Sequence, residues 1–207
     1  MPDQTSTALI DPTLADAADG PVVWAAQLRL HGPRRTSRHQ HARGQLLGAH
    51  QGLLRIDVGH LHWLLPAGHV AWIPPSLPHA LVSAERFDGW SLYFSAEACL
   101  GLPVTPRILQ PNALLKAATA RALQWPHPPL DAVQTRLAGV IADEIAASTP
   151  LPLALAQPRD RRLRRIAAAL TRAPYDNRSI EAWAIASGLS SRSLARRWLA
   201  ETGMTLS

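Results

Sequence analysis

Short apolar runs with alternating polar positions occupy the chain from residue 22 to residue 94. Turns that contain Gly, Pro or Asp separate most of these runs at close spacing, which is typical of a β-sandwich or a β-barrel. The runs are VVWAAQLRL, QLLGA, LLRIDV, HLHWLL, HVAWI, ALVS and WSLYF. The pattern therefore predicts a domain of short strands in this part of the chain.

A different pattern, rich in Ala and Leu, extends from about residue 107 to residue 148 and predicts helix. Apolar residues recur there three and four positions apart, which places them on one face of a helix. The stripe comprises Leu130, Val133, Leu137, Val140, Ile141 and Ile145. It could cover the strand domain of its own chain, or it could pair with the same helix of a second copy.

The remainder of the chain divides into further segments. We expect five parts: residues 1–20 as a disordered N-terminus, 21–100 as the strand domain, 101–148 as a helical packing or dimerisation element, 149–158 as a Pro-rich extended linker, and 159–207 as a helical segment. The last part begins with a basic helix, RDRRLRRIAAALTR. Ser179 and Ser190 are each expected to cap a helix, and Gly188 supplies the turn between those two helices.

The net charge of +6 is unevenly placed. Residues 1–158 contain eleven basic and eleven acidic residues, whereas residues 159–207 contain ten Arg and four acidic residues. The whole excess of positive charge thus lies in the C-terminal part, which suggests a polyanion as its partner. A single cysteine, Cys99, excludes an internal disulfide, and no apolar run is long enough to cross a membrane. We expect a cytoplasmic protein without a signal peptide.

The spacing of three residues in this basic part predicts a helix-turn-helix. Ala184, Gly188 and Leu194 provide a small residue at the helix crossing, a turn glycine and an apolar residue facing back, at separations of four and six. Leu194 and Trp198 would form the buried stripe of the second helix. Its opposite side carries Ser191, Arg192, Arg196 and Arg197.

The stretch ASGLSSRSLARRWLAETGMTLS resembles the first helix-turn-helix of the AraC/XylS family of bacterial transcription regulators. The resemblance implies a DNA interface, with base contacts from Arg192 and Arg196, a weaker role for Ala195, and phosphate contacts near Ser190 and Ser191; Arg197 lies on the same predicted surface. The family's DNA-binding domain continues into a second helix-turn-helix, so we expect this one to be incomplete. Half of such a domain neutralises fewer phosphates, which predicts low affinity with strong salt dependence.

Histidines occupy alternate positions in the stretch HQHARGQLLGAHQG, residues 39–52. On a strand, alternate residues point to one face, so His39 and His41 would project into the same space. The first cupin motif, with glycine, His-x-His, glutamate and glycine, is similar to Gly32, His39-Gln40-His41, Gln45 and Gly52. The second is similar to the segment from Gly68 through Pro74-Pro75-Ser76 to His79 and Ser83. Residues 22–95 thus resemble a small cupin jelly roll, the type of sensor domain that precedes many AraC-like DNA-binding domains.

This resemblance implies a metal site formed by His39, His41, Gln45 and His79. Gln45 replaces the motif's glutamate, Ser76 its glycine and Ser83 its asparagine. Three neutral imidazoles and an amide oxygen can hold Zn, Ni, Fe or Mn, although the missing carboxylate lowers the affinity for a divalent ion. The alternatives are a polar effector pocket without metal, or histidines that merely fill the barrel. His60 and His62 also alternate, but no motif places a third ligand beside them.

Taken together, these observations predict an α+β protein with an N-terminal cupin-like β-jelly roll, flanking helices and an all-α helix-turn-helix segment. We expect a sequence-specific DNA-binding transcription regulator that senses a small molecule or a metal, acts as a homodimer and has no catalytic residues. Two alternatives remain open. One is a cupin metalloenzyme of the dioxygenase or isomerase type, although few general acid–base candidates accompany the histidines. The other is a binding-only fragment that dimerises with intact partners and blocks them.

Overall fold

The computed structural model describes residues 12–17, 20–30, 32–83, 86–125, 130–151, 154–156, 158–172, 176–202 and 204–206. Two compact units are present, and the chain passes from the first to the second between residues 153 and 154. Residues 60–62 group with the second unit. Among the described residues, no helix combines the length and the apolar character that a membrane crossing requires.

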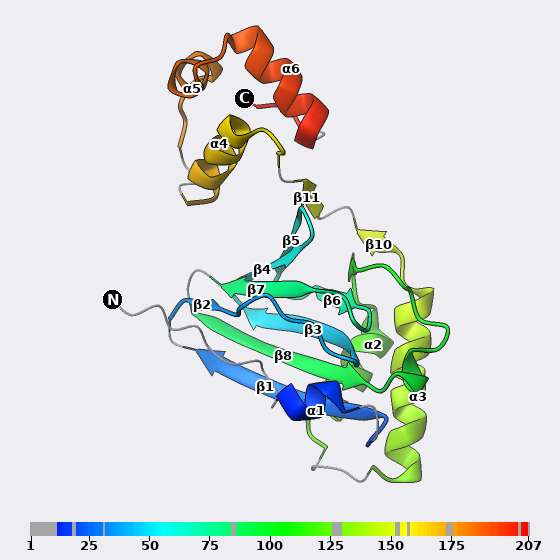
Figure 1. The fold of residues 1–207 in the computed structure, drawn as a ribbon. Coiled ribbons are helices and arrows are strands. Elements are labelled where there is room, and N and C mark those ends of the chain that lie inside the picture. The colour runs from blue at the N-terminus through cyan, green and yellow to red at the C-terminus, as the bar shows by residue number, and fades with distance from the viewer. Residues whose placement is uncertain are drawn as a thin grey trace. The chain divides into compact units, whose positions relative to one another are not determined.

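Short antiparallel strands form the body of the first unit (Figure 1). They are β1 (Val23–Leu30), β2 (Arg34–Arg35), β3 (Gly44–Gln51), β4 (Leu53–Val58), β5 (Leu61–Pro66), β6 (Val70–Ile73), β7 (His79–Ser83), β8 (Phe87–Phe94), β9 (Arg107–Leu109) and β10 (Pro150–Leu151). One sheet has the order β1-β8-β3-β6-β9-β10, and in the other β5, β4, β7 and β2 are consecutive neighbours. All seven strands expected from the apolar runs are present, with ends shifted by a few residues.

The larger sheet is buried on both faces, and β3 illustrates how. Leu46 packs in one apolar cluster with Trp72 and Leu92, whereas its neighbour Leu47 packs in another with Ile56 of the opposite sheet. Successive side chains of a strand point to opposite faces. The cluster that contains Leu47 therefore fills the space between the two sheets, and the cluster that contains Leu46 lies on the outer face. A continuous apolar run is what a strand buried on both sides requires.

Helices cover the outer face of the larger sheet. They are α2 (Ala113–Ala122) and α3 (Ala132–Ala147), and α1 (Pro12–Asp16) and the 3-10 turn η1 (Glu97–Cys99) belong to the same unit. Asn112 caps α2 by accepting a hydrogen bond from the backbone N–H of Leu115, and Asp131 forms a capping box with Gln134 at the start of α3. Figure 1 shows α2 and α3 side by side along the sheet.

The apolar stripe of α3 separates into two adjacent rows. Ile141 and Ile145 are fully buried and pack on the outer face of the sheet. Val133 is 63% exposed, while Leu137 and Val140 are partly exposed. The first row therefore covers the sheet of its own chain. In the second row Leu137 packs partly against the same apolar cluster, and Val133 and Val140 are the accessible positions.

The predicted α+β class, a cupin-like sheet domain with flanking helices, is confirmed by this architecture. Three local expectations are not met. Residues 107–109 form β9 at the edge of β6 instead of helix, because the buried Ile108 and Leu109 complete the sheet. Residues 150–151 of the expected linker form β10. Within the expected disordered N-terminus, residues 12–16 form α1, and Ala15 packs against Tyr93.

The second unit contains β11 (Ala154–Ala156) and three helices, α4 (Arg161–Arg172), α5 (Ile180–Ser187) and α6 (Ser191–Thr202). Ser179 caps α5, and Gly188 ends it with a φ of 65°, a left-handed conformation that glycine adopts without steric cost. Ser190 accepts a hydrogen bond from the backbone N–H of Ser193 at the start of α6. The helices share one apolar core formed by Leu163, Ile166, Trp183, Ala184, Leu194 and Trp198.

Candidate functional site

Three histidine side chains converge inside the first unit. His39 and His79 lie opposite each other in an antiparallel bridge and exchange backbone hydrogen bonds of 2.9 and 2.8 Å. His41 follows in the coil before β3, and its carbonyl oxygen accepts a 2.8 Å hydrogen bond from the backbone N–H of Ser76. One ring nitrogen from each histidine lies within 4.8 Å of the other two. These backbone contacts thus bring distant segments of the chain to one point.

The turn that precedes His79 depends on Ser76. This residue has a φ of 58°, in the left-handed region. That conformation costs a non-glycine residue about 1–2 kcal/mol, which explains why the cupin motif has glycine at the corresponding position. Despite the replacement, the turn keeps the shape that places His79 beside His39 and His41.

Each imidazole is oriented by a backbone carbonyl. The Nδ1 atoms of His39, His41 and His79 lie 2.9, 2.6 and 2.8 Å from the carbonyl oxygens of Ser37, Arg43 and Leu77, respectively. Since a carbonyl oxygen only accepts, each Nδ1 carries the proton and donates it. The lone pair of each neutral ring is then on Nε2, the arrangement found in metal-binding histidines.

Gln45 contributes an oxygen to the same point. Its amide nitrogen donates to Ser91 Oγ at 2.8 Å and to Tyr93 Oη at 3.1 Å, so its Oε1 faces the histidines. This Oε1 lies 3.4 Å from Nε2 of His41, and both atoms are acceptors once Nδ1 holds the proton. Nε2 of His79 is buried and has no hydrogen-bond partner in the described part of the chain.

Burial keeps the rings of His41 and His79 uncharged. It lowers the pKa of His79 to about 3 and also lowers the pKa of His41, in each case by penalising the charged imidazolium. For the same reason, burial raises the pKa of Tyr93 to about 12, so its hydroxyl stays protonated. The site therefore gathers lone pairs from His41, His79 and Gln45, and the buried Nε2 of His79 has no hydrogen-bond partner among the described residues. Such a donor set fits a divalent cation.

A second cluster of predicted residues lies on the exposed side of α6. Leu194 and Trp198 are buried in the helical core, whereas Arg192, Ala195 and Arg196 are exposed. Ser190 is exposed and Ser191 is partly exposed at the N-terminal end of the helix. The predicted buried and exposed positions of α6 thus agree with the structure.

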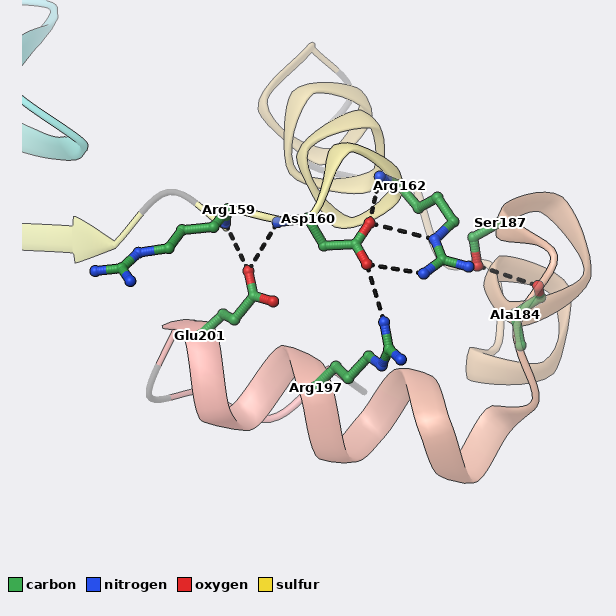
Figure 2. A network of polar contacts seen from close by, with 7 residues as sticks. All are labelled: Arg159, Asp160, Arg162, Ala184, Ser187, Arg197 and Glu201. Carbon is green, nitrogen blue, oxygen red and sulfur yellow. Dashed lines mark hydrogen bonds and ion pairs between the residues drawn. The ribbon is translucent and has the colours of Figure 1, made fainter.

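Arg197 differs from the other arginines of α6, because its guanidinium pairs with Asp160 at 3.1 Å (Figure 2). Arg162 pairs with the same carboxylate at 2.9 Å, and hydrogen bonds from Arg162 are the main reason that the pKa of Asp160 lies well below its usual range. Near the end of α6, Glu201 Oε2 accepts hydrogen bonds of 2.5 and 3.0 Å from the backbone N–H groups of Arg159 and Asp160. Arg197 and Glu201 therefore tie α6 to the start of α4.

The model of the AraC-like ligand binding domain family matches residues 22–183, which is most of the chain. The chain belongs to this family. It is also 25% identical over 173 residues to the HTH-type transcriptional regulator NimR of Escherichia coli (strain K12), covering 81% of this chain. The match spans 61% of the length of that relative.

The solved structures with a similar chain trace match a little over a third of this AraC-like chain. One is an RmlC-like cupin from Shewanella frigidimarina NCIMB 400, with 19% identity, a TM-score of 0.34, and coverage of 36% of this chain and 67% of that one. Another is a cupin superfamily protein from Desulfitobacterium hafniense DCB-2, with 18% identity, a TM-score of 0.35, and coverage of 38% and 72%, respectively.

In this AraC-like domain, the structure brings together all four residues that the sequence indicates, although by a different route. His39 and His41 do not share a regular strand, since the first lies in a bridge and the second in coil. Sequence reasoning missed Ser91 and Tyr93, whose alternate positions in β8 place them on the face of Gln45. It also missed Asp16, whose charge raises the pKa of His41 against the larger effect of burial.

Proposed function

We propose that this chain is a ligand-responsive transcription regulator that reads DNA with α6. The observation that carries the proposal is the exposed face of α6, on which Arg192 and Arg196 stand one turn apart above a core formed by Leu194 and Trp198. The AraC-like ligand-binding domain and the similarity to a transcriptional regulator support it.

The proposed roles on α6 rest on the exposure and the chemistry of its side chains. Arginine can pair bidentately with the O6 and N7 atoms of guanine, so Arg192 and Arg196 are the base-reading residues. Ser190 and Ser191 stand where backbone N–H groups and hydroxyls suit a phosphate. Ala195, between the two arginines, offers only an apolar contact. Arg197 is assigned a minor role, because its guanidinium already pairs with Asp160.

Replacing Arg192 or Arg196 with alanine is expected to weaken specific DNA binding by about 1–3 kcal/mol each, because each loses a bidentate base contact. The measurement is a titration of labelled operator DNA at fixed salt, with sites first selected from random sequence by the unaltered protein. Arg136→Ala on α3 serves as the control, since it removes an exposed charge outside the helical unit. Operator affinity that stays unchanged in both α6 variants would refute the assignment.

We also propose that His39, His41, Gln45 and His79 bind a divalent metal ion of the Zn, Ni, Fe or Mn class. The support is the convergence of the three rings and the unpartnered Nε2 of His79. When bound, the ion would supply a fixed positive charge that anchors a small effector inside the sheet domain. The protein's own part is to hold the rings in the tautomer that leaves the Nε2 lone pair free for the ion, and to exclude water from them.

A homodimer completes the proposal, and the second row of α3 provides its seam. Within α3, Val133, Leu137 and Val140 are spaced four and three apart, which is the a/d spacing of a coiled coil. Leu130 precedes the N-cap Asp131 and packs against the apolar cluster of its own chain. Because Leu137 packs partly against the same cluster as Ile141 and Ile145, the proposed seam rests mainly on Val133 and Val140, with the accessible edge of Leu137 between them.

Replacing Val133 with glutamate is expected to convert the dimer into monomers, because it places a charge in the apolar seam without entering the core. Sedimentation velocity at micromolar concentration measures the change. Thr135→Glu, about half a turn away on the exposed side of α3, is the matched control and should leave the dimer intact. Monomeric unaltered protein, or a dimer that tolerates Val133→Glu, contradicts the proposed seam.

A further inference from the structure

A cavity of about 290 Å³ lies on the outer face of the larger sheet, between β3, β6, β8 and α2. It is separate from the histidine cluster, which occupies the space between the two sheets. Most of its wall is apolar and includes Val70, Trp90, Leu115 and Leu123. At roughly 30 Å³ per water-sized group, the volume suits a molecule of about ten non-hydrogen atoms.

The floor of this cavity is shaped by a close contact between β3 and β8. A Cβ atom on Gly48 would lie 2.5 Å from the Trp90 ring, so the absence of a side chain lets the indole approach the backbone of β3 closely. The centroids of the Trp90 indole and of the His50 ring are 6.5 Å apart. The Trp90 indole, packed closely on β3, is thus part of the cavity wall that faces α2.

Four polar residues also line the cavity. Lys116, the only lysine in the sequence, is exposed at its rim and has no carboxylate partner among the described residues. His50 and His69 lie nearby, because the backbone N–H of Gly68 donates to the carbonyl of Ala49. Thr119 also lines the cavity; it is 4% exposed, and its hydroxyl has no hydrogen-bond partner in the described chain.

An unpaired ammonium, two imidazoles and an unused hydroxyl on the wall of a mostly apolar cavity are suited to one kind of ligand. We propose that this cavity is a second small-molecule site, which binds an organic monocarboxylic acid of about ten non-hydrogen atoms. Its carboxylate contacts Lys116 and the histidines and accepts a hydrogen bond from Thr119, while its apolar body lies on Trp90. The site is independent of DNA binding and of the metal proposal.

The single lysine makes this proposal directly testable in the full chain. An amine-reactive acylating reagent labels Lys116, and mass spectrometry of the peptide reports the rate. Phenylacetate and hexanoate are the probes. We expect one or both to slow the labelling of Lys116 saturably, by at least fivefold, while the reaction of the N-terminal amine is unchanged. The neutral isostere phenylacetamide and the cation phenethylamine should not protect it.

Two substitutions separate a specific site from general shielding. Thr119→Val keeps the shape but removes the hydroxyl, and should raise the probe concentration needed for protection at least threefold. Ala120→Phe fills the cavity from its exposed rim and should abolish protection, whereas Ala117→Phe, exposed on α2 but outside the cavity, should not. Circular dichroism checks that each variant is folded.

The proposal is overturned if neither carboxylate protects Lys116 at 10-millimolar concentration, or if phenylacetamide protects as well as phenylacetate. It is also overturned if Thr119→Val and Ala120→Phe, when folded, leave protection unchanged. None of these outcomes depends on operator affinity or metal content, so this site and the proposed regulator function can fail separately.

Discussion

Replacing His79 with alanine is expected to lower the affinity of the proposed metal site for Zn by more than about 100-fold. Loss of an outer-sphere contact to a metal ligand alone costs 10–100-fold, and His79 supplies a ligand atom itself. The measurement is elemental analysis of the purified protein, followed by competition against a chromogenic chelator. His60→Ala is the matched control, because His60 is exposed and outside the cluster.

Substitution of Gln45 tests the same site in the opposite direction. Gln45→Glu restores the carboxylate of the cupin motif, and both Ser91 Oγ and Tyr93 Oη can still donate to it. The added negative charge should raise the affinity for a divalent ion. If unaltered protein binds no metal and Gln45→Glu does not create binding, the cluster is a polar pocket and the metal assignment is wrong.

Replacing Leu194 with alanine is expected to destabilise the helical unit by about 2–5 kcal/mol, the usual cost of this change in a well-packed core. Leu194 is fully buried between the helices. A small unit has a total stability of only about 5 kcal/mol, so this one should lose cooperative unfolding and operator binding together. Hydrogen exchange of the α4–α6 amides measures the loss.

Leu199→Ala on the same helix is the control for that experiment. Leu199 is 51% exposed, and a surface substitution usually changes stability by less than about 0.5 kcal/mol. The amides of the sheet unit should keep their protection in both variants. Equal destabilisation by the two substitutions, or none by Leu194→Ala, would show that the packing of α6 is not as described.

The strands were predictable wherever an apolar run was long enough to show a period. All seven runs form strands, because alternation and turn residues act locally. The two- and three-residue strands β2, β9 and β10 carry no readable period, and they exist only because a neighbouring strand offers an edge. Similarly, α1 is too short to have a helical pattern of its own, and Ala15 is held by contact with Tyr93.

The site was predictable in its residue types but not in its surroundings. Motif spacing indicated His39, His41 and His79, yet their convergence depends on a backbone bridge and on the turn at Ser76, which no periodicity reveals. The partners of Gln45 depend on register, since β3 and β8 pair so that Gln45 lies opposite Tyr93. Register between strands distant in sequence is a tertiary property. For the same reason, the unused hydroxyl of Thr119 could not be foreseen.

The contacts that Arg197 and Glu201 make with the start of α4 have a consequence for the proposed binding of DNA. They hold α6 at both its middle and its end, so the helix cannot rotate about its axis without breaking charged hydrogen bonds. The backbone that carries Arg192 and Arg196 is therefore already ordered in the free protein, and binding need not include the free-energy cost of ordering it. The helical unit should consequently bind DNA in a preformed conformation. Its association rate should then depend on long-range electrostatic attraction and on orientation, and not on folding coupled to binding.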